Sequence, residues 1–173
     1  MTRQPWTEHI FNLDIDPGWA GNVLTRVRDT EVRLQHYCKR LDDIQLSMKP
    51  GGAWSIKEHI GHLIDLEPLH HGRLKELEAF EKELTGADMS NAKTNAADHN
   101  TKSIENLLKE FSGLRHDFIG DFLATPEAAQ KHAGMHPRLH VMMKPVDLMF
   151  FVAEHDDHHL ASIREIIIEN FRH

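Results

Sequence analysis

The chain has little cysteine and no long apolar run. Cys38 is the single cysteine among 173 residues, so an internal disulfide and a zinc site built from several thiolates are excluded. No apolar segment approaches the roughly 20 residues that a membrane-spanning helix needs, and the segment Met1–Trp6 lacks the apolar core of a signal peptide. We therefore expect no membrane partner and a cytoplasmic location.

Basic residues are too few to form a surface typical of nucleic-acid-binding proteins. The sequence has 20 Lys and Arg against 27 Asp and Glu, a formal net charge of -7, without long runs of one sign. Because nucleic-acid binding depends on basic groups that neutralise phosphates, we expect no nucleic-acid partner. The length fits a single domain over residues 1–173. The unusual feature of the composition is its 15 histidines.

Four segments have the apolar spacing of amphipathic helices. Asp16 and Pro17 form a good helix start, and Ser55 with Glu58 forms a capping box, in which each side chain can bond the backbone N–H of the other residue. Nothing between the segments has the alternation of a β-strand. The predicted helices cover about residues 16–48, 55–84, 101–124 and 145–171. The sequence therefore predicts an all-α fold, a four-helix bundle.

Two long connections, residues 85–100 and 125–144, separate the last three predicted helices. They make a simple up-down-up-down order less favourable. Residues 1–15 have no period and are expected to be irregular. Cys38 lies on the apolar face of the first helix and is predicted to be a core residue, not a nucleophile. Pro68 removes one backbone donor from the second helix, so a kink or an opened turn is expected near Ile64.

The segment Glu154–His159, with the sequence EHDDHH, is the strongest candidate for a functional site. His155 and His159 are four residues apart, so a helix places their rings side by side, at the separation that one metal ion requires. His62 is the well-placed histidine on the apolar stripe of another helix; His59 could share that face but lies in the first turn. Three imidazoles with an open coordination position are typical of a catalytic metal site.

Other histidines are weaker candidates for metal ligands. His158 lies toward the edge of the apolar stripe and is expected to be a neighbour of the ligands. His132, His136 and His140 are also spaced by four residues. However, Pro137 disfavours a helical conformation at the residue before it, so these three rings are not expected to line one face. We expect them on the surface or at the rim of a pocket.

Two motifs resemble a known family. The segment Trp54–Leu63, WSIKEHIGHL, with Glu67 and Arg73 downstream, is similar to the second-helix signature of the DinB/YfiT-like metalloenzymes. The segment Glu154–Ile163, EHDDHHLASI, is similar to their fourth-helix signature. The number, order and length of the predicted helices also fit, so the resemblance spans nearly the whole chain. It implies a bundle of up-down-down-up order, and often a homodimer.

The resemblance also implies a chemistry. The family's three metal ligands fall on His62, His155 and His159. Nitrogen ligands and an open site favour zinc or nickel, with iron, cobalt and manganese as alternatives. Characterised relatives include S-transferases that attach low-molecular-weight thiols, such as bacillithiol or mycothiol, to small electrophiles, and a thiol-dependent maleylpyruvate isomerase. We therefore expect a metal-dependent enzyme that activates a thiol and uses no protein nucleophile.

Two alternatives to a thiol-dependent enzyme stay open. A metal-dependent hydrolase would activate water and would need a general base, for which Glu58 and Asp65 are the candidates by helical position. A non-enzymatic binding or stress-response module would use the metal only to stabilise the bundle. Ligand rings also need partners that orient them. The nearby carboxylates that could do so are Glu58, Asp65, Glu154 and Asp156.

Overall fold

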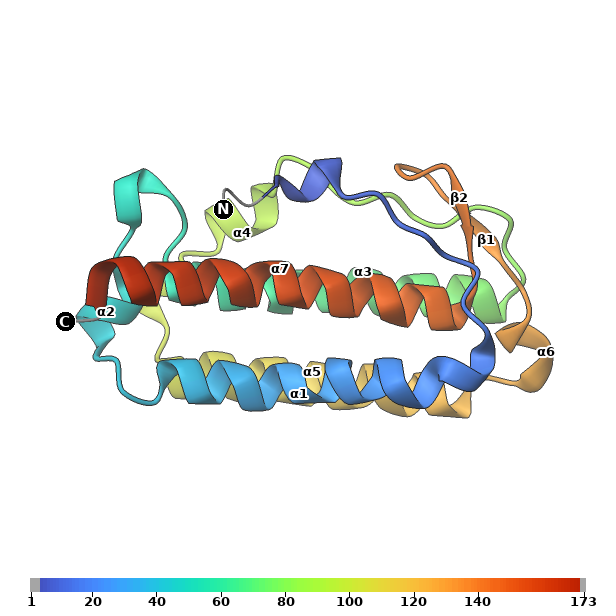
Figure 1. Cartoon of the computed structure of the whole chain (residues 1–173), viewed down its shortest axis with the longest axis horizontal. Helices are drawn as coiled ribbons and strands as arrows, with labels where there is room; N and C mark the ends of the chain where they lie inside the picture. The colour runs from blue at the N-terminus through green and yellow to red at the C-terminus, as the bar shows by residue number, and fades with distance from the viewer. Residues whose placement is uncertain (1–3, 172–173) are drawn as a thin grey trace.

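The structure, a computed structural model, describes residues 4–171 and is dominated by four long helices. These are α1 (Ala20–Cys38), α3 (Ile56–Glu78), α5 (Ile104–Ala124) and α7 (Pro145–Phe171). Helices α1 and α7 run in one direction and α3 and α5 in the other (Figure 1). Helix α7 packs against α1 and α3, and α5 packs against the same two helices. The chain is therefore a four-helix bundle of up-down-down-up order, as expected.

Short elements fill the connections between the long helices. Helix α2 (Asp43–Ser47) follows α1, α4 (Ala92–Ala96) lies in the connection that returns along the bundle after α3, and α6 (Glu127–Gln130) precedes an antiparallel hairpin of β1 (Gly134–His136) and β2 (Val141–Met143) (Figure 1). Turns of 3-10 helix occur at Trp6–Glu8, Pro17–Trp19, Pro50–Gly52 and His99–Thr101. None of the helices within residues 4–171 combines the length and the apolar character needed to cross a membrane.

The first predicted helix, 16–48, starts where expected but ends early. The Asp16 side chain accepts from the Gly18 N–H and caps a 3-10 turn at Pro17–Trp19 that continues directly into α1, and α1 ends at Cys38. A separate capping box then starts α2: the Asp42 carboxylate accepts from the Gln45 N–H, and the Gln45 side chain accepts from the Asp42 N–H. Two helix-start signals in one apolar stretch therefore divide it. Cys38 is buried and burial raises its pKa to about 12, which confirms the prediction of a core cysteine.

The second predicted helix, 55–84, ends six residues early, at Glu78. Phe80 has φ 61, outside the helical region, and the chain then pairs with the hairpin through a hydrogen bond from Leu84 N to Met135 O of 3.0 Å. The opened turn expected near Ile64 is not found: residues 56–78 are all helical, and Pro68 is one of them. The third helix begins at Ile104 instead of 101, where Ser103 caps it.

The absence of strands between the helices is a further wrong prediction. Residues 134–143 form the β1–β2 hairpin, in which Met135 pairs with Met142. Each strand has only three residues, which is too short for an alternating pattern to be recognised. The prediction that residues 1–15 are irregular is confirmed for residues 4–15, apart from the 3-10 turn at Trp6–Glu8. Residues 1–3, on which this prediction and the expected lack of a signal peptide also depend, lie outside the described residues.

A polar layer divides the apolar core into two clusters. The layer lies near the middle of the bundle, and each long helix contributes one buried residue to it: Thr30, Glu67, Arg115 and Asp156. Along α5, for example, Arg115 lies between Phe111 of one cluster and Phe118 of the other. The bundle is therefore apolar at both ends and ionic at its centre.

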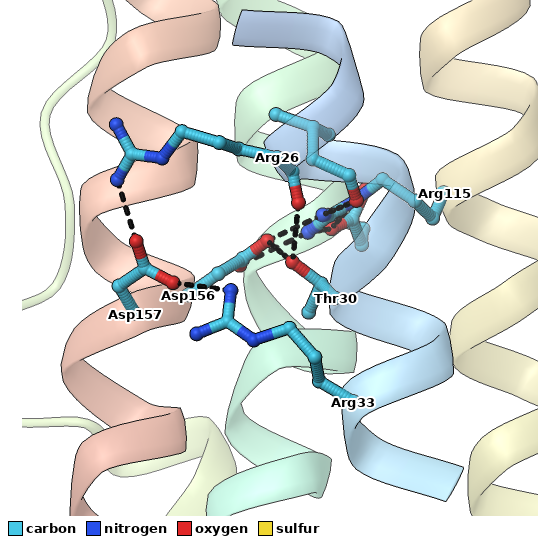
Figure 2. Close-up of polar contacts among 8 residues, drawn as sticks. Arg26, Thr30, Arg33, Arg115, Asp156 and Asp157 are labelled. Atoms are coloured by element: carbon cyan, nitrogen blue, oxygen red, sulfur yellow. Dashed lines mark hydrogen bonds and ion pairs between the residues drawn. The ribbon is translucent and has the colours of Figure 1, made fainter. Parts of the chain in front are cut away.

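Arg115 is the centre of this layer. Its guanidinium is 1% exposed and donates to Glu67 Oε1 at 2.5 Å, to Asp156 Oδ2 at 2.5 Å and to the Val27 carbonyl oxygen at 3.2 Å. Burial alone would lower the pKa of Arg115, but the Asp156 and Glu67 carboxylates raise it. Thr30 Oγ1 donates to the same Asp156 oxygen at 2.8 Å (Figure 2). One guanidinium therefore joins α5 to α3, α7 and α1.

The next residue of α7, Asp157, makes ion pairs near the surface instead. Its two carboxylate oxygens accept from Arg26 Nη2 at 2.5 Å and from Arg33 Nη1 at 2.6 Å, both on α1 (Figure 2). The side chain of Arg33 is 39% exposed. Ion pairs that water and salt can screen contribute little to stability, so the buried layer is the stronger constraint on how α7 lies.

We predict that Arg115→Met destabilises the protein by about 3–5 kcal/mol, because it leaves the Glu67 and Asp156 carboxylates buried without their cation. Urea unfolding with a chelator present measures this. Arg33→Met is the matched control and should cost less than about 1 kcal/mol, because its ion pair is partly exposed. Equal losses in the two variants would contradict the central role of the buried layer.

Candidate metal centre

The start of α3 sets the position of the first predicted ligand. Ser55 Oγ accepts from the Glu58 N–H at 3.1 Å, and the Glu58 carboxylate accepts from the Ser55 N–H at 2.8 Å, which is the predicted capping box. His62 follows two turns into the helix and is 5% exposed. His155 and His159 come from the middle of α7, with 4% and 6% exposure. All three predicted ligands are therefore buried between two helices.

The three rings converge on one point. A ligand atom from each of His62, His155 and His159 lies within 4.8 Å of the other two, and the Nε2 atoms of His155 and His159 are 3.1 Å apart. Two nitrogens that bind one zinc ion tetrahedrally at about 2.0–2.1 Å lie about 3.3 Å from each other. The arrangement of these nitrogens therefore fits a shared divalent ion.

The orientation of His62 is set by a chain of hydrogen bonds. Its Nδ1 lies 3.0 Å from Thr94 Oγ1, and the Thr94 hydroxyl donates to Asp65 Oδ2 at 2.9 Å. Because the hydroxyl has a single proton and gives it to a carboxylate, it accepts from His62 Nδ1. His62 is therefore protonated on Nδ1, and its Nε2 keeps a free electron pair for a metal.

His159 has a partner of a different kind. Its Nδ1 lies 2.9 Å from Nδ1 of His59, which stands three residues before His62 on α3. With a proton on His159 Nδ1, donated to His59, the Nε2 atom of His159 is left as an electron-pair donor that faces His155. Nδ1 of His155 is buried and has no hydrogen-bond partner among the described residues. A shared ion would separate the two facing Nε2 atoms without requiring a proton between them.

Burial keeps the three imidazoles neutral. It lowers the pKa of His62 to about 4, and it lowers the pKa values of His155 and His159 well below their usual range, with neighbouring histidines adding to the effect. A metal binds the neutral form of imidazole, so ligands that are already neutral at pH 7 lose no proton on binding. The three rings are therefore in the protonation state that binds a cation.

The three histidines lie in the wall of a cavity of about 390 Å³, a volume typical of small-molecule sites. Two tryptophans from different parts of the chain cover the rings. The Trp54 ring is 4.8 Å from His62 between centroids, and the Trp6 ring lies edge-on to His155 at 5.1 Å. The donor set is therefore placed beside space that a small substrate can fill.

The four carboxylates considered from the sequence have different partners. Asp65 supports His62 through Thr94 and also lies 2.9 Å from His99 Nε2. Glu58 caps Ser55 and pairs with Lys49. Asp156 belongs to the Arg115 layer, and Glu154 pairs with Arg26. Asp65 is the one that orients a ligand ring, and it does so indirectly.

The remaining predicted histidines fall where expected except His136, which was expected on the surface or at a pocket rim and is buried. His158 packs against the His159 ring with 5.5 Å between centroids and lines the cavity, but it does not join the group of converging ligand atoms. His136 is buried in the cavity wall. His132 contacts the Glu81 carbonyl oxygen, and His140 is exposed. The prediction that the three spaced histidines do not line one face is confirmed.

Sequence reasoning missed several residues in the cavity wall or in contact with the histidines. His70 is buried there, and its position eight residues after His62 on one helical face was an available signal. Thr94 and Trp54 lie outside regular apolar stripes, so no period indicates that they approach the histidines. Long-range contacts of this kind depend on how the connection after α3 folds back over the bundle.

We predict one divalent ion per chain and its loss in His62→Ala, His155→Ala and His159→Ala, because each change removes one of three nitrogen ligands. Elemental analysis of purified protein measures the content. Thr94→Val should weaken metal affinity about 10–100-fold, as loss of a partner that orients a ligand typically does, while Thr94→Ser keeps the hydroxyl and the affinity.

Two variants serve as controls for metal binding. His116→Ala changes a histidine whose side chain is 69% exposed and outside the cavity, and it should retain the metal. His158→Ala should also retain it, because His158 is a neighbour of the converging nitrogens. Equal metal content in all variants would contradict the assignment of His62, His155 and His159 as metal ligands.

We predict that the metal-free protein loses stability as pH falls from about 6.5 to 4. Burial lowers the pKa values of His62 and His136 to about 4, whereas unfolded histidine has a pKa of about 6.5. Below about pH 6.5 the unfolded chain binds protons that the folded chain does not bind. The free energy of unfolding therefore falls as the pH drops from about 6.5 toward 4, and above about pH 6.5 these histidines do not change it. Urea unfolding at several pH values in a chelator tests it; His136→Gln should flatten the slope, and a pH-independent free energy would contradict it.

Comparisons with known proteins place this architecture. The solved structure of YfiT from Bacillus subtilis, described as a probable metal-dependent hydrolase with an unusual four-helix bundle topology, matches with a TM-score of 0.79 and 18% identity, over 93% of this chain and 93% of that chain. At this identity the likeness shows a common fold. No curated protein matches the sequence. The family model of the DinB superfamily matches residues 26–163, which include the three converging histidines. The chain belongs to the DinB superfamily.

Proposed function

We propose that this protein is a metal-dependent enzyme in which His62, His155 and His159 bind one divalent ion, either zinc or nickel. The enzyme activates a low-molecular-weight thiol, which is transferred to a small electrophile or takes part in an isomerisation. The observation that carries the proposal is the convergence of three neutral imidazoles in the wall of a cavity. Within residues 4–171 no fourth His, Cys, Asp or Glu joins the group. This donor set leaves a coordination position for a substrate.

The chain supports the proposed ion with positioned groups and a covered site. When bound, a divalent ion supplies Lewis-acid activation of a thiol or of water. Thr94 and His59 orient His62 and His159 through their Nδ1 atoms. The tryptophans Trp6 and Trp54 limit the access of water to the rings. A site with fixed ligands and little bulk water strengthens electrostatic interactions with a reacting group.

The scarcity of carboxylates near the histidines favours a thiol over water as the activated group. Asp88 is the one Asp or Glu among the described residues that line the cavity, and its oxygens accept from Ser90 and Ala92. The earlier candidates for a general base, Glu58 and Asp65, do not line it. A thiol has a pKa of about 8.5 and needs little help to ionise at neutral pH. Free water has a pKa of about 15.7 and depends on the metal to ionise, and its attack is assisted further by a general base.

A metal-dependent hydrolase is the second candidate. Its support is the likeness to YfiT, which is described as a probable hydrolase of this kind, and the presence of histidines that could act as bases. Several further histidines line the cavity, among them His70 and His158. In this alternative one of them would take the proton of the attacking water.

We predict that zinc- or nickel-loaded protein conjugates a thiol such as bacillithiol, mycothiol or cysteine to a small electrophile such as monochlorobimane, measured by fluorescence of the conjugate. Metal-stripped protein and His62→Ala should fall to the uncatalysed rate, because the ion is absent from both. His116→Ala, which lies outside the cavity, should keep the wild-type rate.

Ester and amide substrates separate the two candidates. Their turnover by metal-loaded protein without added thiol, together with no conjugation across the thiol panel, would contradict the transferase and favour the hydrolase. Inactivity on both panels by a protein that holds one ion per chain would count against either enzyme.

A further inference from the structure

The wall of the histidine cavity also contains two arginines whose charges have no carboxylate partner. Arg73 comes from α3, and Arg138 comes from the turn between β1 and β2. The hairpin approaches α3 because residues 82–84 pair with β1 through Leu84 and Met135. The same wall includes His70 and His136, and no salt bridge among the described residues involves either arginine.

Arg73 is the more deeply buried of the two, with 1% exposure. Its Nε donates to the Thr85 carbonyl oxygen at 2.8 Å, and its Nη2 is buried without a partner in residues 4–171. Glu76 is the nearest acidic influence on Arg73, but its carboxylate accepts from the Thr85 N–H at 2.8 Å and from the Thr85 hydroxyl. Burial lowers the pKa of Arg73 to about 10, so the guanidinium stays charged at neutral pH.

Arg138 repeats this pattern. Its Nη2 is also buried and unpartnered among the described residues, and Arg73 and Arg138 are close enough for Arg138 to lower the pKa of Arg73. His136 adds an uncharged donor: its Nδ1 accepts from the Leu139 N–H at 3.3 Å, so its Nε2, which is buried and unpartnered, carries the proton. Each of these two cations and the imidazole therefore has one buried N–H nitrogen without an acceptor among the described residues.

Buried charges without partners are unfavourable, and proteins normally pair them. The same molecule pairs its other fully buried arginine, Arg115, with two carboxylates. An anion supplied from outside the chain would satisfy Arg73 and Arg138 in the same way. Guanidinium groups match carboxylates and phosphates because they offer two parallel N–H donors.

We propose that Arg73 and Arg138 bind an anionic group, a carboxylate or a phosphate, of the substrate or of the thiol whose reacting end lies at His62, His155 and His159. This inference rests on the proposed function, because it concerns the other end of the molecule whose reacting end lies at the three histidines. The substrate or thiol would then be a small molecule with a reactive centre and a separate anionic group. The guanidinium groups would hold that molecule in register with the three histidines.

Anion binding can be measured apart from metal binding. Full-length protein would be titrated calorimetrically with glutarate, with inorganic phosphate and with neutral glutaramide, at low ionic strength because salt screens charge pairs. The decisive titrations use metal-stripped protein, since both anions can also bind a metal ion directly. We expect glutarate or phosphate to bind and glutaramide not to bind, and the tighter anion indicates whether the recognised group is a carboxylate or a phosphate.

The arginine variants test the assignment. Arg138→Met and Arg73→Met should each weaken anion binding at least about tenfold, because each removes charge-assisted hydrogen bonds. No side-chain hydrogen bond or ion pair with the described residues holds the Arg138 Nη2 atom, so its variant should fold even if Arg73→Met does not. Arg28→Met changes an exposed arginine outside the cavity and should bind like wild type.

The outcomes separate this inference from the proposed function. Anion affinity unchanged in Arg138→Met, or glutaramide bound as tightly as glutarate, would overturn the anion site. His62→Ala should lose the metal and keep the anion affinity. Arginine-dependent anion binding by a wild-type protein that takes up no metal would overturn the metal-dependent function and leave the anion site standing.

Discussion

The ion pairs of Arg115 are the interaction on which the rest of the structure depends. The guanidinium is buried at the middle of the bundle and bonds Glu67 of α3 and Asp156 of α7 directly. Each of these bonds fixes both the position of its helix along the bundle axis and the rotation of the helix about its own axis. Asp156 directly follows His155 in the sequence, so fixing Asp156 also fixes the direction of the neighbouring histidine. The candidate metal site therefore depends on a salt bridge that does not belong to it.

The six residues Glu154–His159 distribute their charges around α7 by helical geometry. Asp156 turns to the bundle centre, whereas Asp157 turns to Arg26 and Arg33 on α1 (Figure 2). The two histidines four residues apart turn to α3. Acidic residues can therefore lie next to two neutral imidazoles in the sequence, because each carboxylate points to an arginine.

Much of this arrangement could be predicted from the sequence, because helical period is a local property. The apolar stripes located the four long helices, and the Ser55 capping box located the start of α3. The converging histidines followed from spacing and inward position. The ends of helices were less predictable: a second start at Asp42 and the positive φ of Phe80 interrupt segments whose apolar pattern continues.

Partners of the site residues could not be predicted for a different reason. Four carboxylates lay within helical reach of the histidines, and spacing alone does not distinguish a ring partner from a helix cap or an ion pair. The structure gives Asp156 to Arg115 and leaves Asp65 to act through Thr94, a residue of the long connection. No periodic signal exists for a contact between a loop and a helix, so such contacts emerge only from the folded chain.

The buried arginines show how stability and function separate in one bundle. Arg115 and Arg73 are equally inaccessible, each with 1% exposure, yet one has two carboxylates and the other has none within the described chain. The first joins helices, and its desolvation is offset within the fold. The second lies where a cavity, a hairpin and the histidine site meet, and a fold under selection for stability alone would replace it with an apolar side chain. A buried arginine at this place is physically reasonable when an anion arrives with the substrate.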